Sequence, residues 1–97
     1  MFKIEKLEVE GASFLGLKVE MEGIAPLLLV EGNKGFVMCG YLNIDAAEKV
    51  GATAAVVSGV SSFDDVLNAE IRTATTKAKA LGLEPGKTVK DVIKAIA

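Results

Sequence analysis

The sequence predicts a single α/β domain in which N-terminal β-strands and hairpins precede alternating helices and strands. The first observation is size, because 97 residues that are 51% hydrophobic suffice for one core. The second is periodicity: apolar residues alternate with polar ones or form short runs in the first half, and recur at helical spacing in the second. We expect one domain, 1–97, with a β region at 1–31, an α/β core at 32–97, and a mixed sheet whose helices pack mainly on one face.

The first strand, at residues 2–9, changes its apolar face midway. Phe2 and Ile4 share one face, whereas Leu7 and Val9 share the other. Since side chains alternate across a strand, this change predicts a bulge or a register irregularity near residues 5–6.

A second strand, at 15–22, follows the turn signal at 11–13. Its apolar residues alternate strictly with Gly16 and with charged residues, so we expect one of its faces to be wet. The apolar positions are Leu15, Leu17, Val19 and Met21.

Three later segments, 27–30, 36–39 and 54–57, are unbroken apolar runs. Strands of this kind are typical of sheets that are covered on both faces. The loop between the first two runs, residues 31–35, contains Gly32 and Gly35, which we expect to adopt positive φ in a hairpin.

Helix signals begin after residue 43. Asp45 and Glu48 have the spacing of a capping box, and Gly51 marks the end of the short helix that it starts. Ser62 is expected to cap a second helix, which ends near Asn68.

Two more helices are predicted beyond that point. From about residue 69 to Gly82, apolar residues fall at helical spacing, namely Ile71, Ala74, Ala78 and Leu81. Thr88 is expected to cap the terminal helix, with Asp91 three residues later. The apolar stripe of this helix consists of Val89, Val92, Ile93 and Ile96.

These few short helices can cover one face of the sheet. The other face must then be covered by the N-terminal strands folding over it, or by another copy of the chain, because large exposed apolar faces are rare on monomers. We therefore expect a homo-oligomer with residues 1–31 at its interface.

Composition excludes several chemistries. The chain has no His and one Cys, which excludes a Ser–His–Asp triad, a Cys–His dyad and a Cys/His zinc site within it. We expect neither a metal nor a cofactor. One Cys also forbids an intrachain disulfide, which fits a reducing cytoplasm.

Charge and hydropathy limit the classes of binding partner that we expect. The formal net charge is −2 and no basic cluster occurs, so nucleic acid is not expected as a partner. No apolar run approaches about 18 residues, so no membrane span is expected. The sequence has no Gln, and its charged residues are rich in Lys and Glu. This composition favours a protein from a thermophile.

Several segments of the sequence carry a family resemblance. They are residues 35–43 (GFVMCGYLN), 54–60 (AAVVSGV), 63–69 (FDDVLNA) and 80–83 (ALGL), followed by a terminal helix after Gly86. Together they resemble the YunC-like family, a domain of unknown function found in bacteria and archaea. The resemblance implies an α/β fold whose N-terminal β region drives tetramerisation, and it implies no reaction.

Cys39 is the one candidate nucleophile. It ends an apolar run and precedes a predicted helix, and a thiol near a helix N-terminus can become reactive. The alternative is a small buried hydrophobe, which is how free Cys most often behaves.

A binding crevice is expected where two strands end. If the strands ending at Cys39 and Ser58 are parallel, their carboxyl ends meet at one edge, where α/β sheets bind ligands. The residues expected to line this crevice, suited to a carboxylate or a phosphate, are Gly40, Asn43, Ser58, Gly59, Ser61 and Ser62. The alternative is that they are only turn and cap residues.

Asp64 and Asp65 could suggest a metal site or an acid/base pair, but acids in the first helical turn commonly serve the helix dipole. Tyr41 is equally ambiguous between packing at an interface, which is the more common role of buried aromatic residues, and catalysis.

The leading hypothesis is a cytoplasmic homo-oligomeric, tetrameric module that binds a small anionic metabolite or serves assembly. The alternatives are a thiol-dependent enzyme using Cys39, and a structural or regulatory subunit.

Overall fold

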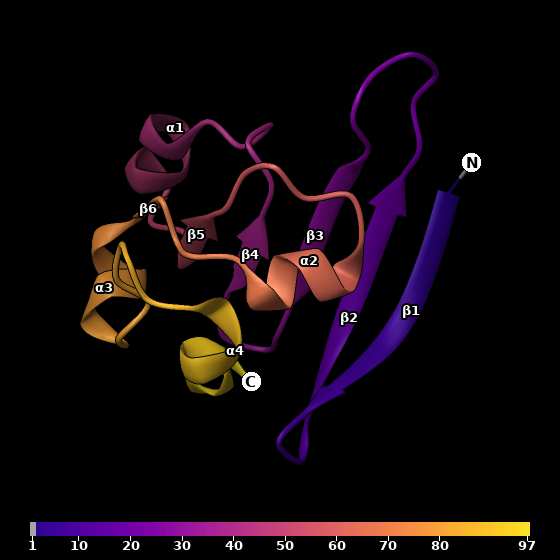
Figure 1. Ribbon diagram of the computed structural model, residues 1–97. Coiled ribbons are helices and arrows are strands. Elements are labelled where there is room, and N and C mark those ends of the chain that lie inside the picture. Colours follow the sequence, from indigo (N-terminus) through magenta and orange to yellow (C-terminus); the bar gives the residue numbers. More distant parts are fainter. Residues whose placement is uncertain (1) are drawn as a thin grey trace.

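The computed structural model describes residues 2–97 and contains one six-stranded sheet whose neighbouring strands follow the chain order (Figure 1). Only β4 and β5 pair in parallel, and the other neighbours are antiparallel. The predicted mixed α/β sheet is therefore confirmed. Its strands are β1 (Phe2–Val9), β2 (Ala12–Val19), β3 (Leu27–Glu31), β4 (Phe36–Met38), β5 (Ala54–Val56) and β6 (Thr73–Ala74).

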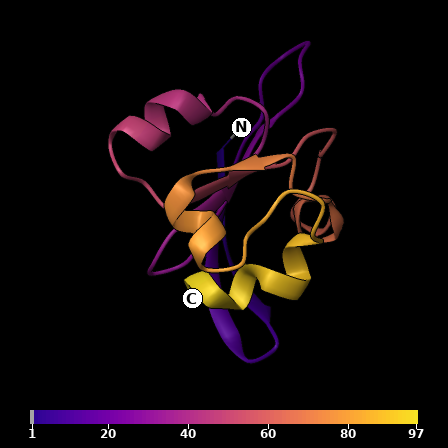
Figure 2. The same cartoon turned by 90° about the vertical axis from the view of Figure 1, so that its left-hand side faces the viewer.

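Short helices fill the connections after β4. They are α1 (Ile44–Lys49), α2 (Phe63–Asn68), α3 (Thr76–Ala80), α4 (Val89–Val92) and the 3₁₀ helix η1 (Ile93–Ile96). Helices α2 and α4 lie on one side of the sheet, which we call the inner face, whereas α1 lies on the opposite, outer side near β5 (Figure 2). The helices thus pack mainly on one face, as predicted.

The core lies between the inner face and the helices. The strand register places Val30, Val37 and Ala55 side by side in one row across β3, β4 and β5. All three are fully buried. They belong to one cluster with helical side chains, including Val66, Val89, Ile93 and Ile96. The predicted apolar stripe of the terminal helix is therefore confirmed at three of its positions as core, with Val92 packed at the margin.

Gly16 explains why α2 can approach the sheet closely. A Cβ atom on Gly16 would lie 2.8 Å from the Phe63 ring and 3.0 Å from Leu7. The face of β2 that carries Phe14 and Gly16 is therefore buried at these two residues. Our prediction that this face is exposed to solvent was wrong at Gly16. The missing side chain of Gly16 is the space that Phe63 occupies.

Strand β1 pairs with β2 without interruption from Phe2 to Val9, so the bulge predicted near residues 5–6 is absent. The change of apolar face is real. Near the N-terminus the inner face carries Lys3 and Glu5, whose Nζ and Oε1 atoms are 3.2 Å apart. Further along β1, Leu7 and Val9 pack against the core.

The glycines of the β3–β4 hairpin allow other segments to pack closely against the loop. They do not adopt positive φ, so our expectation was wrong. Neither Gly32 nor Gly35 has a positive φ. A Cβ atom on Gly32 would collide with the carbonyl oxygen of Ile96, and one on Gly35 would lie 2.5 Å from that of Thr53. The hairpin loop therefore packs directly on the C-terminal segment and on the strand beside it.

The helix predicted to run from residue 69 to Gly82 is wrong in its first half. The backbone N–H groups of Arg72 and Thr75 donate to the carbonyls of Val56 and Ala54, and β6 forms there instead. Pairing with the free edge of β5 outweighs the local helical spacing. The helix begins only after Thr75, whose side chain caps α3.

At two helices the structure differs from the cap that we predicted from the sequence. Asn43, not Asp45, caps α1, because its Oδ1 accepts from the Ala46 N–H at 3.1 Å. Thr88 precedes α4 but makes no side-chain cap hydrogen bond. Ser62 caps α2 as predicted, accepting from the Asp65 N–H.

Glu48 joins α1 to α3. Its Oε1 accepts from the backbone N–H of Thr76 at 2.8 Å. This N–H, followed by the Thr76 hydroxyl, lowers the pKa of the Glu48 carboxyl below its ordinary value. The carboxylate thus satisfies a free donor in the first turn of α3.

We predict that Gly16→Ala lowers the free energy of unfolding by about 1–3 kcal/mol, because the added methyl group overpacks the Phe63 ring. Denaturant unfolding measures this change. Gly40→Ala is the matched control, since a Cβ there meets no atom within 4 Å. Equal stabilities for the two variants would contradict the packing assigned to Gly16.

We predict that Glu48→Gln destabilises the protein at neutral pH but not at strongly acidic pH. A carboxyl whose pKa is lowered by folding stabilises the fold above its unfolded pKa, and loses that contribution as the pH falls through the folded pKa. Urea unfolding of both proteins from pH 7 downward measures the difference. Asp45→Asn on the same helix is the control, and a difference independent of pH would contradict the role of Glu48.

Candidate functional site

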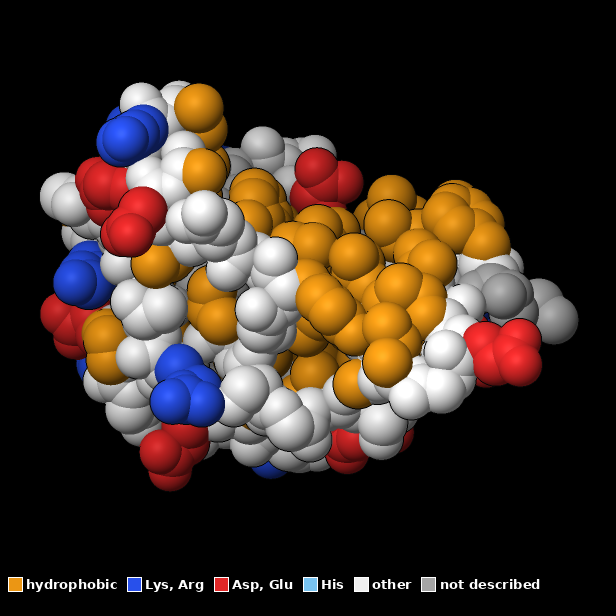
Figure 3. All heavy atoms as spheres, turned by 90° about the horizontal axis from the view of Figure 1, so that it is seen from above, with side chains coloured by type: hydrophobic (Ala, Val, Ile, Leu, Met, Phe, Trp, Pro, Cys, Tyr) orange, Lys and Arg blue, Asp and Glu red, His pale blue; other side chains and the backbone are white. Residues whose placement is uncertain are grey.

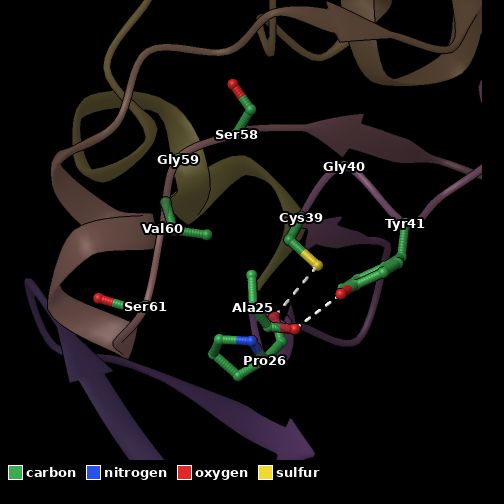
Figure 4. Close-up of a pocket in the computed structure, with 9 residues that line it drawn as sticks. All are labelled: Ala25, Pro26, Cys39, Gly40, Tyr41, Ser58, Gly59, Val60 and Ser61. Carbon is green, nitrogen blue, oxygen red and sulfur yellow. Dashed lines mark hydrogen bonds between the residues drawn. The ribbon is translucent and has the colours of Figure 1, made fainter. Parts of the chain in front are cut away.

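A pocket of about 460 Å³ opens at the carboxyl ends of β4 and β5 (Figure 4). It brings together Cys39 and four of the six residues predicted to line a crevice there. The rest of its wall comes from the β2–β3 loop and from residues next to the predicted ones. The lining residues are Ala25, Pro26, Cys39, Gly40, Tyr41, Ser58, Gly59, Val60 and Ser61.

Parallel pairing places the two strand ends side by side. Met38 of β4 lies beside Val56 of β5, and the Val57 N–H donates to the Met38 carbonyl at 2.9 Å. The chain leaving β4 at Cys39 and the chain leaving β5 at Ser58 therefore emerge at the same edge. This is the position at which open α/β sheets usually form ligand crevices.

The Cys39 side chain extends the pairing of β3 with β4. Its Sγ accepts from the Leu28 N–H at 3.3 Å, while its own N–H donates to the Leu28 carbonyl at 3.0 Å. The thiol also lies 4.0 Å from the carbonyl oxygen of Pro26. Only 4% of the residue is exposed, so Cys39 combines a structural hydrogen bond with a place at the floor of the pocket.

Tyr41 closes one side of the pocket. Its hydroxyl donates to the carbonyl oxygen of Ala25 at 2.7 Å, which links the β4–α1 loop to the β2–β3 loop. The Tyr41 ring and the Cys39 sulfur lie next to each other and both face the Ala25–Pro26 segment (Figure 4). Tyr41 is 47% exposed, so one side of its ring faces solvent.

The α2 side of the pocket is organised by Asp65. Its Oδ2 accepts from both the N–H and the hydroxyl of Ser61, each at 3.0 Å. The Ser61 backbone N–H is the main reason why the pKa of the Asp65 carboxyl is lowered. Asp65 therefore stays negatively charged, and it occupies both hydrogen-bond donors of Ser61.

The opposite end of the pocket lies near a basic side chain. Arg72 Nη1 donates to the Ser58 Oγ at 3.1 Å. The Ser58 and Ser61 hydroxyls both turn away from Cys39 and Tyr41, so the centre of the pocket is walled by apolar groups (Figure 4). No Asp, Glu, Lys or Arg is among the lining residues.

Two of the predicted crevice residues lie outside the lining. Asn43 and Ser62 use their side-chain oxygens to cap α1 and α2. Sequence reasoning missed Ala25, Pro26 and Val60, and it did not include Tyr41 among the residues of the crevice. The contribution of Ala25 and Pro26 depends on the pairing of β3 with β4; the hairpin was predicted, but the position of the loop before β3 at the pocket was not.

The pocket opens within a larger hydrophobic area at this end of the molecule (Figure 3). Ile24 and Tyr41 are its large exposed members near the pocket. Met21, Ile24 and Pro26, together with the polar residues Lys18, Glu20 and Ser61, also line a second, smaller hollow of about 210 Å³ next to the first. Apolar surface thus continues from the pocket over the β2–β3 loop.

Over residues 2–97, the acidic and Cys side chains form no group of three or more that could hold a metal ion. Asp64 and Asp65 lie in the first turn of α2, as the dipole interpretation expects. Within the same range, no helix is long and apolar enough to cross a membrane.

Comparison with known proteins gives consistent results. A family model described as "Domain of unknown function (DUF1805)" matches residues 38–96. The chain is 24% identical, over 97 residues, to the uncharacterized protein YunC of Bacillus subtilis, covering 96% of this chain and 95% of that protein.

A crystal structure of a protein of unknown function from Thermoplasma acidophilum, TA1206, superposes with a TM-score of 0.94. It is 38% identical, and the match covers 100% of this chain and 94% of the other. The YunC-like resemblance noted in the sequence is thereby confirmed. The chain belongs to the DUF1805 family of domains of unknown function.

Proposed function

We propose that this chain is a self-associating cytoplasmic domain that binds a small carboxylic acid with an apolar body in the pocket between β4 and β5. The supporting observation is the pocket itself, which has an apolar centre, together with the Arg72 side chain, which lies outside the lining and donates to the lining residue Ser58. Its volume of about 460 Å³ is within the range of small-molecule sites.

The lining favours an apolar body over a compact inorganic anion. Pro26, Tyr41 and Val60 offer carbon surface, and the Cys39 thiol is the weakest of donors. Two features disfavour phosphate at the α2 end: Asp65 already accepts both donors of Ser61, and its own charge would repel an anion.

The anionic end of the ligand is placed near Ser58. Because the Ser58 oxygen accepts from Arg72, its own O–H proton remains to be donated. Arg72 supplies a positive charge and further N–H donors at the same point. A carboxylate there would receive charge-assisted hydrogen bonds, which are stronger than neutral ones.

Self-association is supported by the outer face of the sheet. Strand pairing places Ile4, Leu17, Leu29 and Met38 in one cross-strand row, and Phe2, Val19 and Leu27 in the next. The N-terminal strands extend the sheet instead of folding over it, and α1 reaches only the β5 end (Figures 1 and 2). Ile4 is 57% exposed and Phe2 61% exposed.

Charged residues mark the limit of this apolar surface. Lys6 and Glu31 flank Leu15 in the third row, and Glu8 follows on the same face of β1. An apolar centre with a polar margin is the usual composition of a protein interface. A second copy of the chain is the occupant we propose, because one such face can match itself across a two-fold axis. The tetramer implied by the family resemblance would need a further contact.

A thiol-dependent reaction has less support. Cys39 lies in the pocket, but the lining contains no His, Asp, Glu or Lys to act as its general base. Its sulfur is already a hydrogen-bond partner of the β3 backbone. We therefore assign Cys39 to the wall of the binding site.

We predict that a member of a panel of aromatic and branched aliphatic carboxylic acids raises the melting temperature by a few degrees, since binding to the native state alone stabilises it. Gly40→Leu should abolish the shift by filling the pocket, and Ala80→Leu on α3 is the matched control. Arg72→Gln should weaken the acid about tenfold and leave its uncharged amide unaffected. No shift with any acid, or a shift that survives Gly40→Leu, would contradict the proposal.

We predict that the wild-type chain has a solution mass at least twice its 10.1 kDa, and that Ile4→Lys reduces this mass to that of one chain. A charge in the apolar row would be buried without a partner in the assembly. Leu81→Lys, a similar change at an exposed residue after α3, should leave the mass unaltered. Light scattering coupled to size exclusion measures all three, and a monomeric wild type overturns the proposal.

A further inference from the structure

The pocket is bordered by a link between two loops that are distant in sequence. The Tyr41 hydroxyl and the Ala25 carbonyl are 2.7 Å apart, and both residues line the pocket. In the β2–β3 loop, the Ile24 N–H donates to the Met21 carbonyl at 3.4 Å, and the Cys39 thiol lies 4.0 Å from the Pro26 carbonyl oxygen. The Tyr41 hydrogen bond is thus the shorter of two contacts that join this loop to the segment after β4, beside that of Cys39 with Pro26.

Tyr41 lies in a short turn whose two flanking residues, Cys39 and Asn43, are held in place. The Leu42 N–H donates to the Cys39 carbonyl at 3.2 Å and closes the turn. Cys39 is buried on one side, and Asn43 is held as the cap of α1 on the other. If Tyr41 moves, residues 40–42 can therefore change conformation while the strand before them and the helix after them stay in place.

Gly40 is the residue at which such movement can occur. Its φ is not positive, and a Cβ there would meet no atom within 4 Å. Neither backbone conformation nor packing in the closed arrangement therefore requires glycine. What glycine adds at this position is freedom to adopt other backbone conformations.

We propose that Tyr41 is a gate for the floor of the pocket at Cys39, hinged at Gly40 and latched in the closed position by its hydrogen bond to Ala25. The proposal rests on the proposed ligand-binding function and adds its regulation. With the latch closed, the Tyr41 ring lies beside the Cys39 sulfur and Cys39 is only 4% exposed (Figure 4). Opening the latch uncovers the sulfur and the floor of the pocket together.

Cys39 makes the gate measurable, because it is the one thiol of the chain. The rate at which iodoacetamide alkylates native protein, followed by mass spectrometry, reports how often the sulfur is uncovered. Tyr41→Phe removes the latch and keeps the ring, so labelling should be about fivefold faster, the factor expected for one hydrogen bond. Gly40→Ala should slow labelling about two- to fivefold by stiffening the hinge.

Ser62→Ala is the matched control, since it removes one side-chain hydrogen bond, the cap of α2, outside the gate. Its labelling rate should equal that of the wild type once differences in unfolding free energy are taken into account. Each rate is measured at two pH values, because a variant that altered only thiol ionisation would change their ratio. Equal rates for wild type and Tyr41→Phe, or the same acceleration in Ser62→Ala, would overturn the gate.

Should Tyr41→Phe fail to fold, Gly40→Ala decides alone, and a rate at or above that of the wild type overturns the proposal. The labelling assay needs no ligand. Failure of every carboxylic acid to bind would therefore refute the proposed function without affecting the labelling result, and an ungated Cys39 would refute the gate without affecting ligand binding.

Discussion

The parallel pairing of β4 with β5 is the constraint on which the site depends. Each of the other strand pairs is antiparallel, so their connections alternate between the two ends of the sheet. At the one parallel pair, the loops after Cys39 and Val57 emerge together and leave space between them. Antiparallel β3 beside β4 then brings Ala25 and Pro26 to the same edge, where they complete the wall of the pocket.

The same arrangement leaves the outer face of the N-terminal strands uncovered. Gly16 admits the Phe63 ring of α2, and the C-terminal helices also pack on the inner face. Only α1 crosses to the outer side, where it lies near β5. The proposed assembly surface therefore follows from the small number of short helices that this chain has to cover a six-stranded sheet.

Local patterns in the sequence sufficed for features that depend on neighbouring residues. Examples are the change of face in β1, the Ser62 cap and the buried side of the terminal helix. Strand β6 was missed because its stability comes from pairing with β5, about 18 residues earlier in the chain, while its own spacing resembles a helix. The crevice was located by strand direction, but its wall at Ala25 and Pro26 depends on a distant hairpin.

The most direct test is an NMR map of backbone amide shifts as an acid from the panel that stabilises the protein is added. If parallel strand ends create the site, the largest changes fall on residues 25, 39–41 and 58–61, with a further change at the Arg72 side chain. Changes that concentrate on the outer face of β1 and β2, or that spread evenly over the chain, would contradict this account.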